Sequence, residues 1–287
     1  MPQISYYPVC QVDFDQFTNA FNRAYSDYFT PIIMTPGSFR ALIRQDDLDL
    51  DASVAALADH DIIGTGMLGL RQDEAWIGGM GVVPEWRRRG IGQRMMEHLL
   101  EQAQARGACE VRLEVIEANE AARRLYERLG FVPIRRLLVL ERPPGNASPA
   151  PTGYTIRTWP AADLLQYFPA FHDTANCWQR DIRSLQHRAD MVRGWAALRE
   201  ETVVGYGLGW SYRHEIRLVD LATHPDEDRA AVAAAILAHL HRMQPEAFGH
   251  SYNIAEDDPA LAGYFSSGYA MSLRQHEMRL SLAAGTP

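Results

Sequence analysis

Three arginines and two glycines stand together in the segment Arg87-Arg88-Arg89-Gly90-Ile91-Gly92. It follows an apolar stretch that predicts a strand and precedes one that predicts a helix. A glycine turn at a helix start points backbone N–H groups outward, and the helix dipole adds partial positive charge. Missing Cβ atoms let phosphate oxygens approach that backbone, and guanidinium groups can fork onto phosphate. The pattern indicates a pyrophosphate site, although a solvated basic turn has the same residues.

The elements that would position this loop follow from the spacing of apolar residues. We expect a helix over residues 14–28, strands over 54–57, 62–70 and 76–83, a helix over 91–106, a strand over 111–116, a helix from the cap Asn119 to 129, and a strand over 137–140. This order, helix, hairpin, strand, helix, strand, helix, strand, predicts an α/β fold with a mixed sheet and helices on both faces.

The second half of the chain repeats the pattern of the first. At one constant spacing, three residues have counterparts: Gly64 and Gly205, Gly66 and Gly207, Pro84 and Pro225. Residues 125–131 match residues 263–269 at a spacing three residues smaller. A colinear set with one small gap favours duplication. A stretch rich in Pro, Gly, Ser and Ala predicts a linker over residues 143–152, so the expected domains are 1–142 and 153–287.

The blocks around the arginine loop resemble the GNAT superfamily of N-acetyltransferases. They are residues 82–92, Asn119 with Tyr126, and Leu129-Gly130-Phe131. The resemblance covers residues 62–131 well and the preceding helices only by pattern. It implies two GNAT-like domains in tandem, each with a splayed sheet. In the first, acetyl-CoA would enter as a cosubstrate between the strands 76–83 and 111–116.

The resemblance also implies roles for individual residues. The backbone of Met80, Gly81 and Val82 would hold the pantetheine arm, and the loop of Arg87, Arg88, Arg89, Gly90, Ile91 and Gly92 would wrap the pyrophosphate. Asn119 would bond the cofactor arm, and Tyr126 would donate a proton to the departing thiolate. From the residues alone, Asn119 is also a helix cap and Tyr126 also a core aromatic, and both alternatives stay open.

Acetyl transfer to an amine also needs a base, because a free lysine with a pKa near ~10.4 is mostly protonated at neutral pH. Glu114 shares one face of its expected strand with Arg112 and Ile116. At its place before Asn119, it resembles the catalytic glutamate of GNAT enzymes that acetylate protein N-termini. Pairing with Arg112, or a base that acts through water as in many relatives, are the alternatives.

The second half lacks these groups. Asp228-Arg229-Ala230-Ala231-Val232-Ala233 aligns with the arginine loop, while Asp257 faces Asn119 and Tyr252 faces Glu114. Only Tyr264, the counterpart of Tyr126, is kept. We therefore expect a degenerate second domain that binds no acetyl-CoA.

Composition excludes several classes of protein. The formal charge of −8, from 28 Lys and Arg against 36 Asp and Glu, argues against nucleic acid as a partner. No apolar run reaches the ~18 residues of a membrane span, and the start has no signal-peptide pattern. The three cysteines have no zinc-ligand spacing, so no metal is expected. These features indicate a cytoplasmic protein.

The leading interpretation is an N-acetyltransferase that moves an acetyl group from acetyl-CoA to a primary amine by direct attack in a ternary complex. Its acceptor would be a small-molecule or peptide amine. The alternative is a non-catalytic acyl-CoA-binding or sensing protein whose second domain contacts a partner. The joint presence of Glu114 and Tyr126 favours the enzyme. The apolar stretch 28–37 is an acceptor site, a packed loop or an interface, and a homodimer is compatible with it.

Overall fold

The computed structural model describes residues 2–30, 32–173, 175–212 and 214–282. The chain divides into two compact units, unit 1 (Met1–Ile134 and Glu277–Pro287) and unit 2 (Arg135–His276). Strands β6 (Val132–Arg142) and β12 (Ala270–Ser281) each contribute residues to both units. The expected linker, residues 143–152, therefore lies wholly within unit 2, and the domain limits drawn from it stay a prediction.

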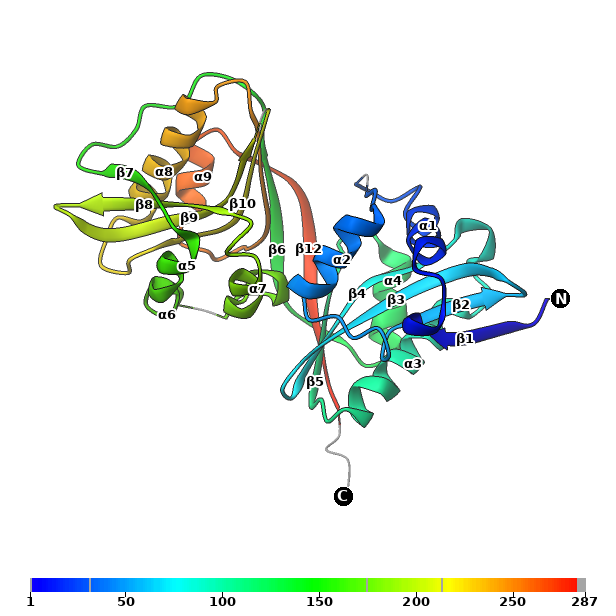
Figure 1. The fold of residues 1–287 in the computed structure, drawn as a ribbon. Helices are drawn as coiled ribbons and strands as arrows, with labels where there is room; N and C mark the ends of the chain where they lie inside the picture. Colours follow the sequence, from blue (N-terminus) through cyan, green and yellow to red (C-terminus); the bar gives the residue numbers. More distant parts are fainter. Residues whose placement is uncertain (1, 31, 174, 213, 283–287) are drawn as a thin grey trace. The chain divides into compact units, whose positions relative to one another are not determined.

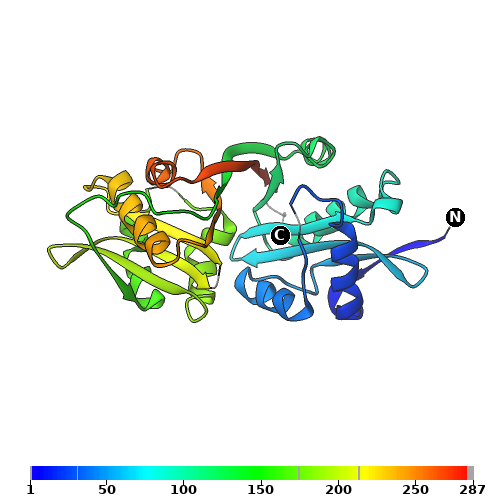
Figure 2. The same ribbon diagram turned by 90° about the horizontal axis from the view of Figure 1, so that it is seen from above.

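Unit 1 is a mixed α/β unit whose strands follow the order β1-β2-β3-β4-β5-β12. Its elements are β1 (Ile4–Pro8), η1 (Val9–Gln11), α1 (Phe14–Ala24), α2 (Pro36–Gln45), β2 (Val54–Ala58), β3 (Asp61–Arg71), β4 (Glu74–Val82), η2 (Pro84–Trp86), α3 (Ile91–Ala105), β5 (Glu110–Ile116) and α4 (Glu120–Arg128), with the start of β6 and the end of β12. Figure 2 shows α1 and α2 on one side of β3 and β4, and α3 and α4 on the other. The predicted fold class is confirmed.

Strand β1 corrects the expected element order, which began with a helix. It pairs antiparallel with β2 from Ile4 opposite Ala58 to Pro8 opposite Val54. Its five residues end at a proline, which an edge strand tolerates because one side of its backbone needs no partner. So short a segment shows too little alternation to be recognised in the sequence.

Glycines on β3 let α3 lie close to the sheet. A Cβ on Gly64 would lie 2.7 Å from the sulfur of Met95, and one on Gly66 would lie 3.0 Å from Leu99. On the opposite face, α1 packs Phe21 near Gly79 of β4, where a Cβ would lie 3.1 Å from its ring. The two helical layers therefore hold the middle of β4 in a fixed place.

Unit 2 repeats this plan, with the strand order β12-β6-β11-β10-β9-β8-β7 (Figure 1). Its further elements are β7 (Thr155–Trp159), α5 (Ala161–Leu164), η3 (Leu165–Tyr167), α6 (Phe168–Phe171), η4 (Trp178–Arg180), α7 (Ile182–His187), β8 (Arg193–Arg199), β9 (Thr202–Tyr212), β10 (Glu215–Thr223), α8 (Arg229–Met243), β11 (Phe248–Ala255) and α9 (Leu261–Ser266). Two buried clusters line its sheet, one beneath α8 and α9 and one beneath α5 to α7.

Matching backbone details show that the units share one fold. In unit 1, the Val83 N–H donates to the Ile63 carbonyl at 2.9 Å, just past the end of β4. In unit 2, the His224 N–H donates to the Val204 carbonyl at 2.8 Å, just past the end of β10. The two bonds lie at the spacing that relates the repeated glycines, which agrees with duplication.

Candidate active site

The sheet of unit 1 opens into a fork between β4 and β5. These parallel strands pair only from Glu74 opposite Glu110 to Trp76 opposite Arg112. Beyond that rung β4 runs on to Val82 and β5 to Ile116, with no further pairing between the described residues. A fork of this kind leaves backbone N–H and C=O groups for an extended ligand that lies like an added strand. This is the predicted splay.

A β-bulge re-aims the backbone of β4 inside the fork. The register between β3 and β4 shifts between Thr65 and Met67, which leaves an extra residue on β4. Gly79 lies there with a φ of +60°, a conformation that favours glycine. Its carbonyl accepts from the Thr65 hydroxyl at 3.2 Å, and the Met80 carbonyl accepts from the Tyr25 hydroxyl at 3.3 Å. Residues 80–82, predicted to hold pantetheine, directly follow this fixed point.

The arginine loop ends at a helix start without a side-chain cap. Gly90 is the N-cap of α3 with a φ of +80°, and no side chain of the described residues caps it. The helices α1, α2 and α4 are instead capped by Asp13, Thr35 and Asn119. The first N–H groups of α3 therefore have no side-chain cap among the described residues, and the anion site at this loop stays a prediction. Gly92 packs on Met80, whose methyl carbon would lie 3.3 Å from an added Cβ.

The structure gives Arg87 a different set of partners from the expected phosphate. Its guanidinium makes two bonds of 2.7 Å to the Asp27 carboxylate. It also donates to the carbonyls of Val82 at 2.9 Å and Ala24 at 3.0 Å. The hydrogen bonds from Arg87 lower the pKa of Asp27. Arg87 thus ties the end of α1 to the end of β4.

The other two arginines of the loop are exposed. Arg88 has a φ of +61°, which turns the backbone ahead of Gly90. Arg89 donates to the Glu85 carbonyl at 3.1 Å and lies 4.7 Å from the centre of the Trp86 ring. Arg88 and Arg89 therefore bring positive charge to the α3 N-terminus, while Arg87 shapes the fork.

Tyr126, which is 7% exposed on α4, belongs to a group of three phenols with one amide beside them. Burial, and then the neighbouring Tyr28, raise the pKa of Tyr126. Burial is also the main cause that raises the pKa of Tyr25 and Tyr28, and Tyr28 bonds to the side chain of Asn119. A raised pKa keeps a phenol protonated, which is the form that can donate a proton.

The side chain of Asn119 makes two contacts. Its Oδ1 accepts from the Ala122 N–H at 3.3 Å, so the predicted helix cap is confirmed, and its side chain also bonds to Tyr28. Tyr25 and Tyr28 were predicted only as aromatic residues of a helix. The sequence signal for their role was their phenol groups at the end of that helix, close to the family's acceptor side.

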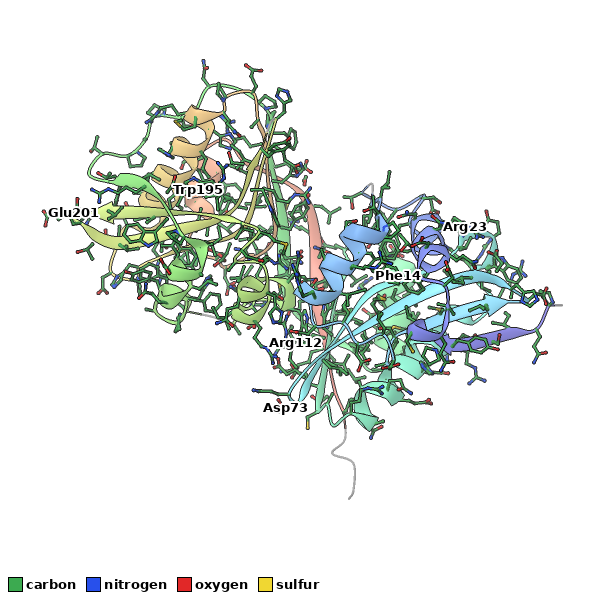
Figure 3. The ribbon with its side chains drawn as sticks, viewed as in Figure 1. Phe14, Arg23, Asp73, Arg112, Trp195 and Glu201 are labelled. Carbon is green, nitrogen blue, oxygen red and sulfur yellow. The ribbon has the colours of Figure 1, made fainter. Side chains whose placement is uncertain are left out.

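Glu114 lies on β5, two residues beyond the last rung of the fork. Its Oε2 accepts from the indole Nε1–H of Trp76 at 2.8 Å. Arg112, labelled in Figure 3, bonds to Glu110 at 2.6 Å and to Glu74 at 2.9 Å. The predicted base is thus a half-buried carboxylate in the fork, held by a residue that the sequence did not single out.

The apolar stretch 28–37 follows α1. Residue 31 lies outside the described residues. Phe29 and Ile33 are 52% and 83% exposed, so these two side chains are not packed into the core of the unit. Both the acceptor-site and the interface interpretations remain compatible with this exposure.

The corresponding helix start in unit 2 is closed by its own carboxylate. Asp228 is the N-cap of α8, and its Oδ1 accepts from the Ala231 N–H at 3.0 Å. Both α3 and α8 have 15 residues, so Asp228 corresponds to Gly90. The alignment of Asp228 with Arg87 was therefore wrong. Because Pro84 and Pro225 follow the two matching strands, the three-residue deletion falls inside the loop itself.

The fork of unit 2 is filled by buried side chains of the same unit. The Arg180 guanidinium donates to Asp220 on β10 at 3.0 Å and to the Tyr252 carbonyl on β11 at 3.2 Å. Asp220 also accepts from the Tyr206 hydroxyl at 2.9 Å and lies 3.1 Å from His172. These contacts join β10 to β11 where β4 and β5 separate in unit 1.

Comparison with known proteins supplies the family. The model of the acetyltransferase (GNAT) family matches residues 10–131. These residues belong to the GNAT family. The ribosomal protein bS18-alanine N-acetyltransferase of Salmonella typhimurium is 44% identical over 59 residues, which are 21% of this chain and 40% of that relative. The chain thus spans about two fifths of the length of the curated relatives it matches.

Solved structures show the tandem GNAT fold over almost the whole chain. A GCN5-related N-acetyltransferase from Sphaerobacter thermophilus is 17% identical with a TM-score of 0.75, over 99% of this chain and 97% of that one. A tandem GNAT protein from the clavulanic acid biosynthesis pathway is 14% identical with a TM-score of 0.73, over 99% and 100%. At these identities the likeness shows the fold alone.

The described residues lack two further features. No described helix of the chain has the length and apolarity that a membrane crossing requires. Among the same residues, no three His, Cys, Asp or Glu side chains are grouped so that they would bind a metal ion.

Proposed function

We propose that unit 1 is an acetyltransferase that moves an acetyl group from acetyl-CoA to a primary amine. The observation that carries this proposal is the fork between β4 and β5, which holds the Glu114 carboxylate and leads to the uncapped N-terminus of α3. A base in a strand fork and an anion site at the adjoining helix start suit a thioester with a pyrophosphate tail. The family membership of residues 10–131 supports the same reaction class.

The residues of the fork fit acetyl-CoA as a cosubstrate. The backbone of Met80, Gly81 and Val82 would hold the pantetheine arm, because the described residues of β5 do not pair with β4 there. The N–H groups of Gly90, Ile91 and Gly92 would bind the pyrophosphate, with the charges of Arg88 and Arg89 beside them. Asn119 would bond the arm. For Arg87 we propose an indirect part, in which its bonds to Asp27 and to the carbonyls of Ala24 and Val82 keep the fork in shape.

The reaction follows from the two titratable groups. Glu114 accepts a proton from the ammonium form of the acceptor, whose nitrogen then attacks the thioester carbonyl carbon. The new C–N bond forms as the C–S bond breaks, and Tyr126 gives its phenol proton to the departing sulfur. The nitrogen then loses its second proton, which restores the phenol of Tyr126. The products are an amide and the free thiol of coenzyme A. Burial keeps Tyr126 protonated until the sulfur leaves.

The acceptor is proposed as a small-molecule or peptide amine. The printed name of one relative states that it acetylates an alanine of ribosomal protein bS18, so an alanine-starting peptide is a sensible first probe. A screen of peptides, polyamines, amino acids and aminoglycosides, read as thiol release, tests the proposal. An amine that accelerates thiol release above the amine-free rate supports it, and no accelerating amine across all four classes argues against it.

Unit 2 is proposed as a GNAT-like unit that binds no acetyl-CoA. Asp228 fills the anion position at α8, and Arg180 with Asp220 fills the fork. The alternative function, an acyl-CoA sensor whose second unit contacts a partner, needs the same cosubstrate site but no base. The cytoplasmic location and a homodimer stay predictions from the sequence.

A further inference from the structure

The contact between Trp76 and Glu114 is built into the fork. Trp76 is 6% exposed, and its indole N–H donates to Glu114 Oε2 at 2.8 Å. A Cβ on Gly78 would lie 2.1 Å from the indole ring of Trp76. The ring therefore lies along β4 over Gly78, and a residue with a side chain there would displace it. The lack of a side chain at Gly78 therefore leaves the space that this indole occupies.

Unit 2 provides an internal comparison of the same two strand positions. Its counterparts are Arg217 on β10 and Tyr252 on β11, since the rung Trp76–Arg112 corresponds to the rung Arg217–His250. The Arg217 guanidinium lies 5.3 Å from the centre of the Tyr252 ring. The scaffold thus accepts a different contact across these strands. An indole that donates to a carboxylate is not required by the fold itself, and it occurs in the unit with the open fork.

We propose that Trp76 is a positioning residue for the base of the reaction, because its indole N–H holds one oxygen of the Glu114 carboxylate beside the fork. This inference rests on the proposed function, in which Glu114 takes the proton of the amine. A hydrogen bond donated to a carboxylate favours its ionised form, which is the form that accepts a proton. The indole therefore extends the activity of the base to lower pH.

Other charged groups lie on the two strands of the fork and on the neighbouring strand β12, so the test needs a control. They are Glu74 on β4, Glu110 and Arg112 on β5, and Glu277 and Arg279 on β12. The substitution Trp76→Phe leaves all of them in place and removes the indole donor. Its matched control is Trp195→Phe in unit 2, because Trp195 is 5% exposed and packs in the core of that unit (Figure 3).

In Trp76→Phe we expect kcat/KM for the amine to fall about tenfold or more, the usual effect of one lost charge-assisted hydrogen bond. The acidic limb of its pH profile should move to higher pH, while the affinity for acetyl-CoA stays within about twofold of the parent. Trp195→Phe should change neither. The double variant Trp76→Phe/Glu114→Gln should be no less active than Glu114→Gln alone, because Trp76 acts through Glu114.

Two outcomes would overturn the inference: an unmoved acidic limb in Trp76→Phe, or losses that add fully in the double variant. If Trp76→Phe does not fold, benzothienylalanine at position 76 keeps the ring shape and removes the N–H, with the same expectations. Glu114→Gln keeps the two hypotheses apart. Full activity in that variant refutes the proposed base, whereas a large loss there with an unmoved limb in Trp76→Phe refutes only the role of Trp76.

Discussion

The substitution Gly90→Asp would give α3 the cap that α8 already has. Asp228 accepts the Ala231 N–H at 3.0 Å, so a carboxylate at position 90 should bond to the Gln93 N–H and place a negative charge beside the N–H groups that we assign to the pyrophosphate. An added Cβ meets nothing within 4 Å at Gly90. The φ of +80° strains any residue with a side chain, but aspartate tolerates this backbone conformation better than most.

The expected magnitudes separate binding from stability. A side chain in this backbone conformation costs about 1–2 kcal/mol, and a new N-cap returns a few tenths of a kcal/mol. One lost charge-assisted bond costs the ligand about 1.5–3 kcal/mol, and each 1.4 kcal/mol is a factor of about ten in affinity. Repulsion between the new carboxylate and the phosphates adds to the loss. Acetyl-CoA affinity should therefore fall at least about tenfold while the fold survives.

Calorimetric titration with acetyl-CoA measures this effect, and thermal unfolding confirms the fold. Gly107→Asp is the matched control, because Gly107 follows the other end of α3 with a φ of +84° and equally open space. Gly90→Asn supplies the cap without the charge and should fall between parent and Gly90→Asp. Parental affinity in Gly90→Asp would refute the assignment of the pyrophosphate to this helix start.

Three further predictions concern the base, the second unit and acid stability. Glu114→Gln should lower turnover by roughly 10²–10⁴-fold, with a loss that shrinks at high pH where free amine is abundant. Parental turnover at neutral pH would refute Glu114 as the base and favour a base that acts through water. Calorimetry on the full chain should give one acetyl-CoA per chain, and two would contradict the closure by Arg180. Burial, and then the charge of Arg142, lower the pKa of His241 from 6.5 to about 4. Between pH 6.5 and about 4, the His241 ring takes up a proton in the unfolded chain but not in the folded one. His241 should therefore make the free energy of unfolding fall as pH drops through this range, by at most about 1.4 kcal/mol per pH unit. Urea unfolding should show less of this slope in His241→Gln, and equal slopes would contradict the assignment.

Local features of the fold were predictable from the sequence. The aromatic spacing of α1, the cap Asn119 and the glycine start of α3 each depend on neighbours within a few residues. The fork was predicted from the family resemblance and not from the spacing of residues. Strand β1 was missed because a short edge strand carries little alternation.

Contacts between distant residues decided the parts of the site that the sequence did not give. Trp76 and Glu114 are 38 residues apart, Arg87 and Asp27 are 60 apart, and Arg180 and Asp220 are 40 apart. Each pairing depends on how strands and helices come together, and no periodicity encodes it. The contacts of Arg87 between α1 and β4 could not be predicted from the sequence, and its part at the phosphate stays a prediction. The closed fork of unit 2 became visible only in the structure.

The most direct test of the central claim is identification of the products when the full chain, acetyl-CoA and the best amine of the screen react together. The account predicts acetylated amine, seen by mass spectrometry, in equal amount to the coenzyme A thiol, and far less of both with Glu114→Gln. Acetyl-CoA that binds to the chain but yields no acetylated amine with any class of acceptor would contradict it and favour the sensor.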